Sequence, residues 1–195
     1  MGMNEKKREA TKNKIKECFA HLVIEKGFQS VTVSDIARKT NLNRGTFYLH
    51  YLDKFDLLQQ LEEDLLAGFK EEFEKGNGKI YGLCLMHPDI IVSAMNFALK
   101  NNLFIKALIS ENGPLGFIEK FKVMLRDHLR TQKDYLTTLA KRFGNVPKDY
   151  AEEILLARVT SILALWVKKE VHEKEDPRTI AEMIVRFSTL PVSRV

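Results

Sequence analysis

Six residues between positions 43 and 54 have side chains suited to binding a polyanion. They are Asn43, Arg44, Thr46, Tyr48, His50 and Lys54. The arginine fork matches the acceptor edge of guanine, and Tyr, His and Lys side chains donate hydrogen bonds to phosphate. No Asp or Glu occurs from position 36 to position 52. The stretch predicts a surface that meets phosphates, although each residue taken alone also fits an ordinary solvated helix.

Three N-cap signals predict that three helices begin around these residues. Thr32, Asn43 and Asp53 are preferred N-cap types, spaced 11 and 10 residues apart, and Asp35 follows Thr32 at the capping-box position. Asn41 supplies the left-handed turn between the first two helices. Apolar pairs flank each cap as hydrophobic staples: Val31 with Ile36, Leu42 with Phe47, and Leu52 with Leu57. A helix, a tight turn and a second helix of about two turns form a helix-turn-helix.

In a DNA-binding helix-turn-helix, the second helix lies in the major groove with its first turn at the base edges. Phe47 and Tyr51, four residues apart, form the inward face of this helix. Its other side presents Arg44 and Gly45, and the helix starts beside it favour anions. Of the predicted contacts, His50 is the one expected to be partly buried, because it follows Phe47 and adjoins Tyr51. The predicted DNA contacts are Thr32, Ser34, Asn43, Arg44, Gly45, Thr46, Tyr48, His50 and Lys54.

The stretch "GFQSVTVSDIARKTNLNRGTFYLHYLDKFDLL" resembles the DNA-binding domain of TetR/AcrR-type transcriptional regulators. The shared residues are Gly27 and Phe28, the Thr32-to-Ala37 segment, the Thr46-to-Tyr51 segment, and Lys54 with the leucines after it. The resemblance implies DNA-contact roles for Arg44, Gly45, Thr46, Tyr48, His50 and Lys54. Asn41 and Asn43 replace a frequent Gly and Ser, and Phe55 replaces a frequent Glu. The stretch "ALKNNLFIKALISENGPLGFIEKFK" also resembles a C-terminal region from one low-GC bacterial branch of this family.

The whole chain of 195 residues is predicted to be all-α, with about nine helices. A three-helix DNA-binding domain at residues 1–56, with the helix-turn-helix at about 32–51, precedes a larger helical bundle at 57–195. The expected helices span residues 4–26, 54–74, 88–100, 149–172 and 177–188, with another in "NNLFIKALIS" and an amphipathic stretch at 115–143.

The C-terminal helices are expected to form a homodimer. Residues 154–167 contain a single charge, Arg158, so this helix must be covered on several sides. Two such helices in each chain would form a four-helix interface, and a central helix in a monomeric bundle is the alternative. The predicted interface residues are Leu155, Val159, Ile162, Trp166, Ile180, Ile184 and Phe187.

The resemblance also implies a small-molecule pocket in the C-terminal domain. For His128, which extends the stripe of Phe117, Phe121 and Met124, a core or interface role is the alternative to ligand contact. The predicted lining residues are Cys84, Met95, Phe104, Phe121, Met124, His128 and Trp166.

Charge, composition and motifs restrict the function class. Residues 1–56 hold 11 Lys/Arg against 7 Asp/Glu, and residues 57–195 hold 20 against 19, so the excess lies in the first quarter. No phosphate-binding loop, nucleophile elbow or metal-ligand set is present, so no enzyme, cofactor or metal is expected. Cys18 and Cys84 are expected to be free thiols, and a cytoplasmic protein without membrane spans is predicted. The expected function is that of a dimeric repressor released from a pseudo-palindromic operator by a small-molecule effector. The alternative is a regulator of the same fold that acts through a protein partner as a co-activator.

Overall fold

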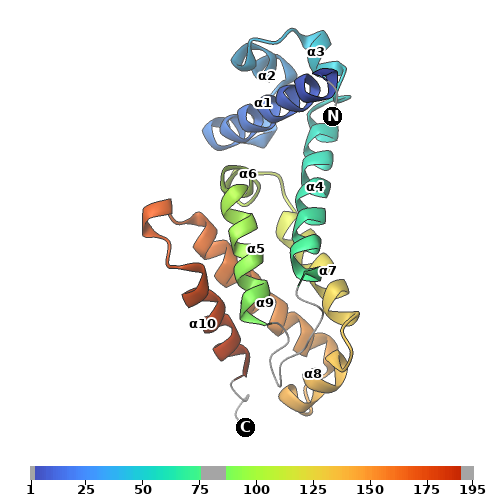
Figure 1. Cartoon of the computed structure of the whole chain (residues 1–195), viewed down its shortest axis with the longest axis vertical. Coiled ribbons are helices and arrows are strands. Elements are labelled where there is room, and N and C mark those ends of the chain that lie inside the picture. Colours follow the sequence, from blue (N-terminus) through green and yellow to red (C-terminus); the bar gives the residue numbers. More distant parts are fainter. Residues whose placement is uncertain (1–2, 76–86, 190–195) are drawn as a thin grey trace. The chain divides into compact units, whose positions relative to one another are not determined.

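The computed structural model describes residues 3–75 and 87–189, and these residues form an all-helical protein without strands (Figure 1). Ten α-helices and two short 3₁₀ helices occur in this part of the chain, one α-helix more than expected. The chain divides into two compact units. The first contains residues 1–65 and 101–117, and the second contains residues 66–100 and 118–195.

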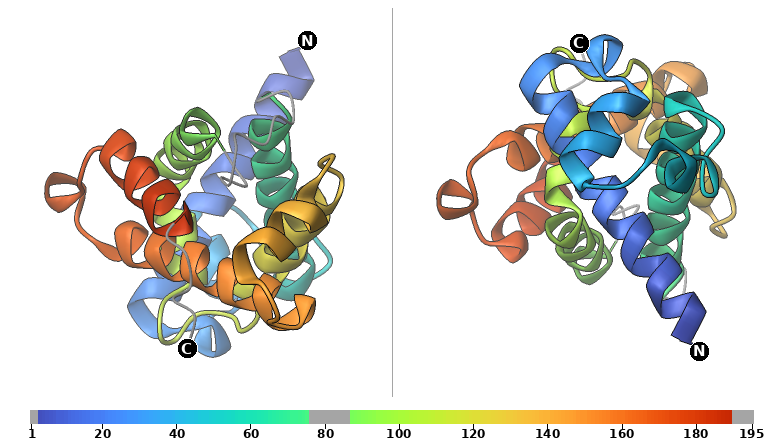
Figure 2. Two further views of the ribbon diagram at one scale, coloured as in Figure 1. Left: turned by 90° about the horizontal axis from the view of Figure 1, so that it is seen from below. Right: turned by 90° about the horizontal axis from the view of Figure 1, so that it is seen from above.

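The first unit is built around α1 (Met3–Lys26), which packs against α2 (Val33–Thr40) and α6 (Asn102–Leu108). An apolar stripe on α1 is buried, with Ile15, Phe19 and Val23 at most 1% exposed. Figure 2 shows the unit from two further directions. The inclusion of α6 was not predicted, since the proposed domain ended at residue 56 and that position falls inside α4 (Lys54–Glu74).

A tight turn ends α1 and leads into the 3₁₀ helix η1 (Phe28–Ser30). Gly27 has a φ of 80°, which favours glycine, and a Cβ there would lie 3.1 Å from the Asn112 Cβ. The Phe28 amide donates a 2.8 Å hydrogen bond to the Asn112 carbonyl. The loop after α6 is therefore fastened to the segment that precedes the helix-turn-helix.

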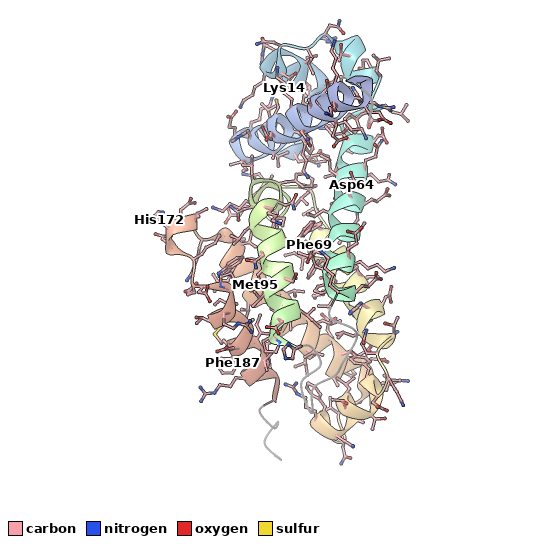
Figure 3. The ribbon with its side chains drawn as sticks, in the orientation of Figure 1. Lys14, Asp64, Phe69, Met95, His172 and Phe187 are labelled. Carbon is pink, nitrogen blue, oxygen red and sulfur yellow. The ribbon has the colours of Figure 1, made fainter. Side chains whose placement is uncertain are left out.

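The second unit contains α5 (Pro88–Lys100), α7 (Phe117–Arg130, from residue 118 on), α8 (Tyr135–Phe143), α9 (Lys148–Lys168) and α10 (Pro177–Thr189). Its core includes an aromatic cluster on the second half of α4 and on α7. Phe69, labelled in Figure 3, lies 5.0 Å from Phe121 and 4.9 Å from Phe97 between ring centroids. Edge-on rings at such distances add to the stabilisation that burial provides.

The amphipathic stretch predicted at residues 115–143 is divided into two helices. Asp134 adopts a left-handed conformation with φ 67°, and this conformation separates α7 from α8. Asp176 caps the start of α10, because its side chain accepts hydrogen bonds from the Arg178 and Thr179 amides. No helix in the described ranges is long and apolar enough to cross a membrane.

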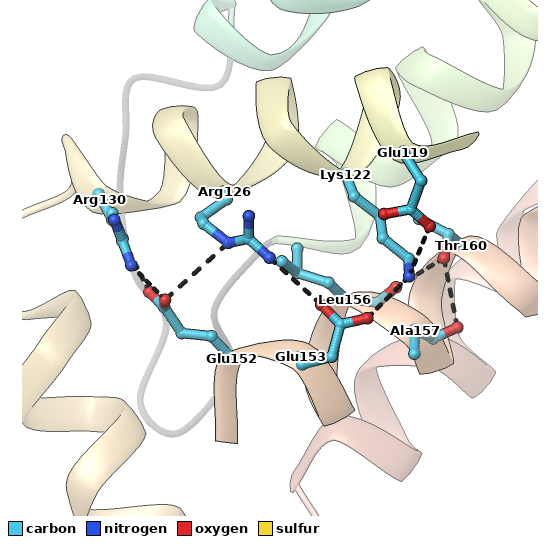
Figure 4. Close-up of polar contacts among 9 residues, drawn as sticks. All are labelled: Glu119, Lys122, Arg126, Arg130, Glu152, Glu153, Leu156, Ala157 and Thr160. Carbon is cyan, nitrogen blue, oxygen red and sulfur yellow. Dashed lines mark hydrogen bonds and ion pairs between the residues drawn. The ribbon is translucent and has the colours of Figure 1, made fainter. Parts of the chain in front are cut away.

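A row of ion pairs joins α7 to α9 (Figure 4). The Glu152 carboxylate, on a side chain only 3% exposed, accepts hydrogen bonds from both Nε and Nη2 of Arg130. Glu153 accepts from Lys122 at 2.7 Å and from Arg126 at 3.2 Å. The Arg130 hydrogen bond is the main cause that holds the pKa of Glu152 below its ordinary value of 4.5.

Glu152 should make the protein acid-sensitive. A depressed pKa in the folded state means that the unfolded chain binds the proton first, so stability is lost as the pH falls below about 4.5 and through the folded pKa. In denaturant titrations from pH 7 to pH 3, the free energy of unfolding is expected to fall less steeply in Glu152→Gln than in the wild type. Glu182→Gln, at an exposed position of α10 outside this row of ion pairs, is the control and should leave the wild-type dependence on pH. An equal dependence of the free energy of unfolding on pH in Glu152→Gln and the wild type would contradict the role of Glu152 in acid sensitivity.

Candidate nucleic-acid interface

Thr32 begins α2 with the predicted capping box. Its hydroxyl accepts from the Asp35 amide at 3.2 Å, and the Asp35 carboxylate accepts from the Thr32 amide at 3.0 Å. Hydrogen bonds from Lys26 and from Thr32 are the leading causes that hold the pKa of Asp35 far below its usual range. Ser34, in the first turn of the same helix, is half-buried. The start of α2 is therefore rigidly defined.

The turn into α3 (Arg44–Tyr48) also follows the sequence prediction. Asn41 is left-handed, with φ 53° and ψ 34°. The Asn43 side chain accepts from the Thr46 amide at 2.7 Å and from the Thr46 hydroxyl at 3.1 Å. In the free protein, Asn43 and Thr46 are therefore bonded to each other as the cap of α3.

The third helix is five residues long, shorter than the two turns expected, but Phe47 on it and Tyr51 just after it form the predicted inner face. Phe47 and Tyr51 are buried, at 1% and 3% exposure, and their rings lie 5.6 Å apart. Arg44 and Gly45 are exposed, and Tyr48 is 55% exposed. An arginine, a residue without a side chain and a phenol thus form an outward surface that a DNA groove can accept.

His50 is half-buried, as expected, in the turn after α3. Its Nδ1 atom is buried without a hydrogen-bond partner among the described residues. Burial, followed by the positive charges of Arg8 and Lys12, lowers the pKa of His50 below its ordinary value of 6.5. The imidazole is therefore neutral near pH 7.

Lys54 is bonded within its own unit. Its ammonium donates to the Phe28 carbonyl at 3.0 Å and to the Gln29 carbonyl at 2.8 Å. The same nitrogen lies 4.9 Å from the Phe28 ring centroid and 5.3 Å from that of Phe55. Lys54 thus connects the start of α4 to η1, a role that the sequence prediction of a phosphate contact did not include.

Replacing Lys54 with methionine is expected to lower the free energy of unfolding by about 1–3 kcal/mol, because two carbonyls lose a charged donor. DNA binding should weaken on all sequences alike, since η1 leads directly into α2. Thermal unfolding and DNA titrations measure the two effects, and Lys54→Arg, which keeps the charge, should restore part of both. Unchanged stability together with a reduced salt dependence of DNA binding would instead indicate a phosphate contact alone.

The N-cap predicted at Asp53 is confirmed, but the hydrophobic staple predicted between Leu52 and Leu57 is wrong. Asp53 accepts from the Phe55 and Asp56 amides at 2.7 and 2.8 Å. Leu52, however, is 81% exposed, because its amide is tied to the Asp56 carboxylate and its side chain points to solvent. Leu49 is exposed by 78% as well, so apolar side chains border the α3 surface.

A groove of about 930 Å³ lies between the second half of α4 and α7. Of the predicted pocket residues, Met124 and His128 line it, while Met95 and Phe121 are buried core residues. The residues of α4 that form one wall of this groove were not predicted. The only sequence pattern that indicates this wall is the four-residue spacing of Leu66, Lys70 and Glu74. The lining residues are Leu66, Ala67, Lys70, Glu74, Glu119, Lys120, Val123, Met124, Asp127, His128, Thr131 and Gln132.

The remaining predicted pocket residues are not gathered at this groove. Phe104 belongs to the first unit, where its ring lies 5.3 Å from the Lys16 ammonium. Trp166 is 2% exposed at the end of α9, and its indole donates to the Glu175 carbonyl at 2.9 Å. Cys84 lies outside the described residues, and Cys18 is a buried free thiol.

Most of the predicted dimer-interface residues are already covered within one protomer. Only Ile162 and Phe187 of that set retain accessible surface, and Phe187 is 45% exposed. The large hydrophobic side chains that remain exposed on α9 include Tyr150, at 69%, Ile154, at 44%, and Leu165, at 64%. The buried members of the predicted set are Leu155, Val159, Trp166, Ile180 and Ile184.

Comparisons with known proteins agree with these features. Residues 20–61 match the model of bacterial regulatory proteins of the tetR family, and residues 87–190 match a transcriptional regulator C-terminal region. A curated relative, the uncharacterized HTH-type transcriptional regulator YxbF of Bacillus subtilis, is 33% identical over 60 residues, which are 31% of this chain and 16% of that protein. The alignments cover 16% and 35% of the lengths of the first two curated relatives.

Solved structures share the fold over nearly the whole chain. A TetR transcriptional regulator from Streptococcus agalactiae has a TM-score of 0.61 at 23% identity, covering 96% of this chain and 98% of that one. The regulator FadR of Bacillus subtilis, solved in complex with stearoyl-CoA, has a TM-score of 0.63 at 16% identity, covering 92% and 98%. The C-terminal model alone matches more than half of the chain, and the N-terminal model falls on the helix-turn-helix. The chain therefore belongs to the TetR family of transcriptional regulators, which are not enzymes.

Proposed function

We propose that the protein is a dimeric repressor that binds a pseudo-palindromic DNA operator through α3 and is released by a small-molecule effector. The proposal rests on the exposed surface of Arg44, Gly45 and Tyr48, on a helix whose start is fixed by Asn43. In this geometry Arg44 contacts base edges, and Gly45 lets the backbone approach the groove closely. Tyr48 donates to a phosphate beside the groove.

The other predicted contacts support this surface in different ways. Thr32 and Ser34 lie in the first turn of α2, where amide groups favour a phosphate. Thr46 and Asn43 exchange part of their mutual hydrogen bonding for DNA contacts when the operator binds. Lys54 holds η1 through the Phe28 and Gln29 carbonyls, and His50, in the turn after α3, is placed for a phosphate contact at the edge of the site.

A symmetric dimer through α9 and α10 would supply two copies of α3. One side of α9 carries Ile154, Ile162 and Leu165. Ile162 and Leu165 follow Ile154 by eight and eleven residues, which are close to whole numbers of helical turns. Phe187 provides an exposed apolar side chain on α10. A two-fold symmetric dimer bound to a pseudo-palindromic operator presents its two recognition helices about 34–36 Å apart, the repeat of the DNA major groove.

The groove between α4 and α7 is the proposed effector site. Its volume is within the usual range for small-molecule pockets, and Leu66, Val123 and Met124 give it apolar surface. A ligand there touches the second half of α4, the helix whose first residue, Lys54, holds η1. Stearoyl-CoA in the FadR neighbour supports a ligand with an extended apolar part. Binding that shifts α4 would alter the DNA-binding unit and weaken operator affinity.

Selection of bound duplexes from a random DNA pool tests the proposal. The expected product is a pseudo-palindromic sequence, bound by a protein dimer as judged from the mass of the complex. An asymmetric site bound by one protomer would contradict the dimer. Failure to bind any duplex without a second protein would favour the co-activator alternative. A screen of fatty acyl compounds against the selected duplex then tests release by an effector.

A further inference from the structure

The positive charge of the DNA-binding unit is concentrated in the first turns of α1 rather than in the helix-turn-helix. Residues 1–16 contain six Lys/Arg and two Asp/Glu, whereas residues 17–56 contain five of each. The first quarter of the chain is basic, but none of the predicted DNA contacts precedes Thr32. Because non-specific attraction to DNA comes almost entirely from cations near phosphates, the location of this charge matters.

The cations after residue 16 are largely engaged within the protein. Lys26 and Arg38 pair with Asp35, and Lys39 pairs with Glu25. In contrast, Arg8 and Lys12 have no carboxylate within ion-pair distance in the described part of the chain. Arg8 is exposed and Lys12 half-buried, so both cations remain available for an anion.

Arg8 and Lys12 lie on the side of α1 that packs against the rest of its unit. They continue the buried stripe of Ile15, Phe19 and Leu22 towards the N-terminus at the same helical spacing. In both Figure 1 and Figure 2, α1 passes beside the first turn of α4, and its N-terminal turns extend beyond it. The influence of both cations on the pKa of His50 places them near the turn that follows α3.

We propose that the first turns of α1 are a second DNA-binding element, in which Arg8 and Lys12 contact the phosphate backbone beside the half-site bound by α3. This inference rests on the proposed DNA-binding function. A cation that contacts phosphate releases a condensed counterion without sequence preference. The α1 element therefore contributes affinity and orientation, while Arg44 contributes sequence preference.

The test compares Arg8→Gln/Lys12→Gln with the wild type on a selected operator and on a random duplex at several salt concentrations. The slope of log affinity against log salt should become shallower by about 2 for each protomer on the DNA, at about 0.9 for each phosphate contact. Affinity should fall by the same factor on both duplexes. Lys133→Gln/Lys141→Gln removes the same charge from exposed positions of the second unit and should change neither quantity.

A DNA-free measurement tests the placement separately. NMR titration of His50 should show a higher pKa in Arg8→Gln/Lys12→Gln than in the wild type, because two positive charges are removed. Wild-type affinity and salt slope in this variant, with weakened binding in Arg44→Ala, would overturn the inference and leave the proposed function intact. A wild-type protein that binds no duplex would overturn both.

Discussion

Replacing Arg44 with alanine is expected to reduce operator affinity by about 2–6 kcal/mol for a dimer, since each bidentate base contact is worth about 1–3 kcal/mol. Arg44 is exposed at the first position of α3, and no ion pair holds its guanidinium within the described residues. The side chain is free to enter the groove, so its loss removes base contacts without unfolding the unit. Binding to random duplexes should weaken much less.

Fluorescence anisotropy on operator and random duplexes measures this loss of preference. Arg44→Lys is the matched control, because lysine keeps the charge but lacks the planar fork. We expect it to retain non-specific binding and to lose most of the discrimination between bases. If Arg44→Ala weakens binding to both duplexes equally, Arg44 contacts phosphate and another residue of α3 contacts the bases.

Replacing Trp166 with alanine is expected to lower the free energy of unfolding by about 3–5 kcal/mol, the usual cost of deleting a large buried aromatic side chain. The indole fixes the end of α9, and the Lys174 ammonium lies 5.1 Å from its ring centroid. Lys174 also donates to the carbonyls of Trp166, Val167 and Lys169 at 2.7, 2.8 and 2.6 Å. Loss of the ring therefore removes packing and loosens a cap on three carbonyls.

Denaturant unfolding followed by circular dichroism measures this change, because Trp166 is the only tryptophan and fluorescence is lost with it. Trp166→Phe is the control. It keeps an aromatic ring but removes the hydrogen bond to the Glu175 carbonyl, so a smaller loss of about 1–3 kcal/mol is expected. A loss below 1 kcal/mol in Trp166→Ala would show that the end of α9 does not depend on this side chain.

The sequence predicted the helix-turn-helix well because its determinants are local. The caps at Thr32, Asn43 and Asp53 join atoms at most three residues apart, and the left-handed Asn41 depends on its own backbone preference. The burial of Phe47 follows from helical spacing, and Tyr51, just beyond α3, keeps a four-residue hydrogen bond to the Phe47 carbonyl. The hydrophobic staple predicted at Leu52 was wrong, because the spacing of residues cannot show that a side chain turns outward into solvent.

Partners distant in the chain were decided only by the tertiary structure. Lys54 bonds to carbonyls 25 and 26 residues earlier, and α6 joins the first unit although its sequence follows α5 of the second. Likewise, α9 is apolar on several sides, so its periodicity could not separate Leu155 in the core from Leu165 at the surface.

The sequence by itself determined the all-α class, the three capped helix starts and the outward set of Arg44, Gly45 and Tyr48, since short-range hydrogen bonds and helical periodicity specify them. The tertiary structure alone decided the groove between α4 and α7, the ion pairs of Glu152 and the nearness of Arg8 and Lys12 to His50. Each of these depends on how separate helices pack, and packing selects among many arrangements that the same local pattern allows.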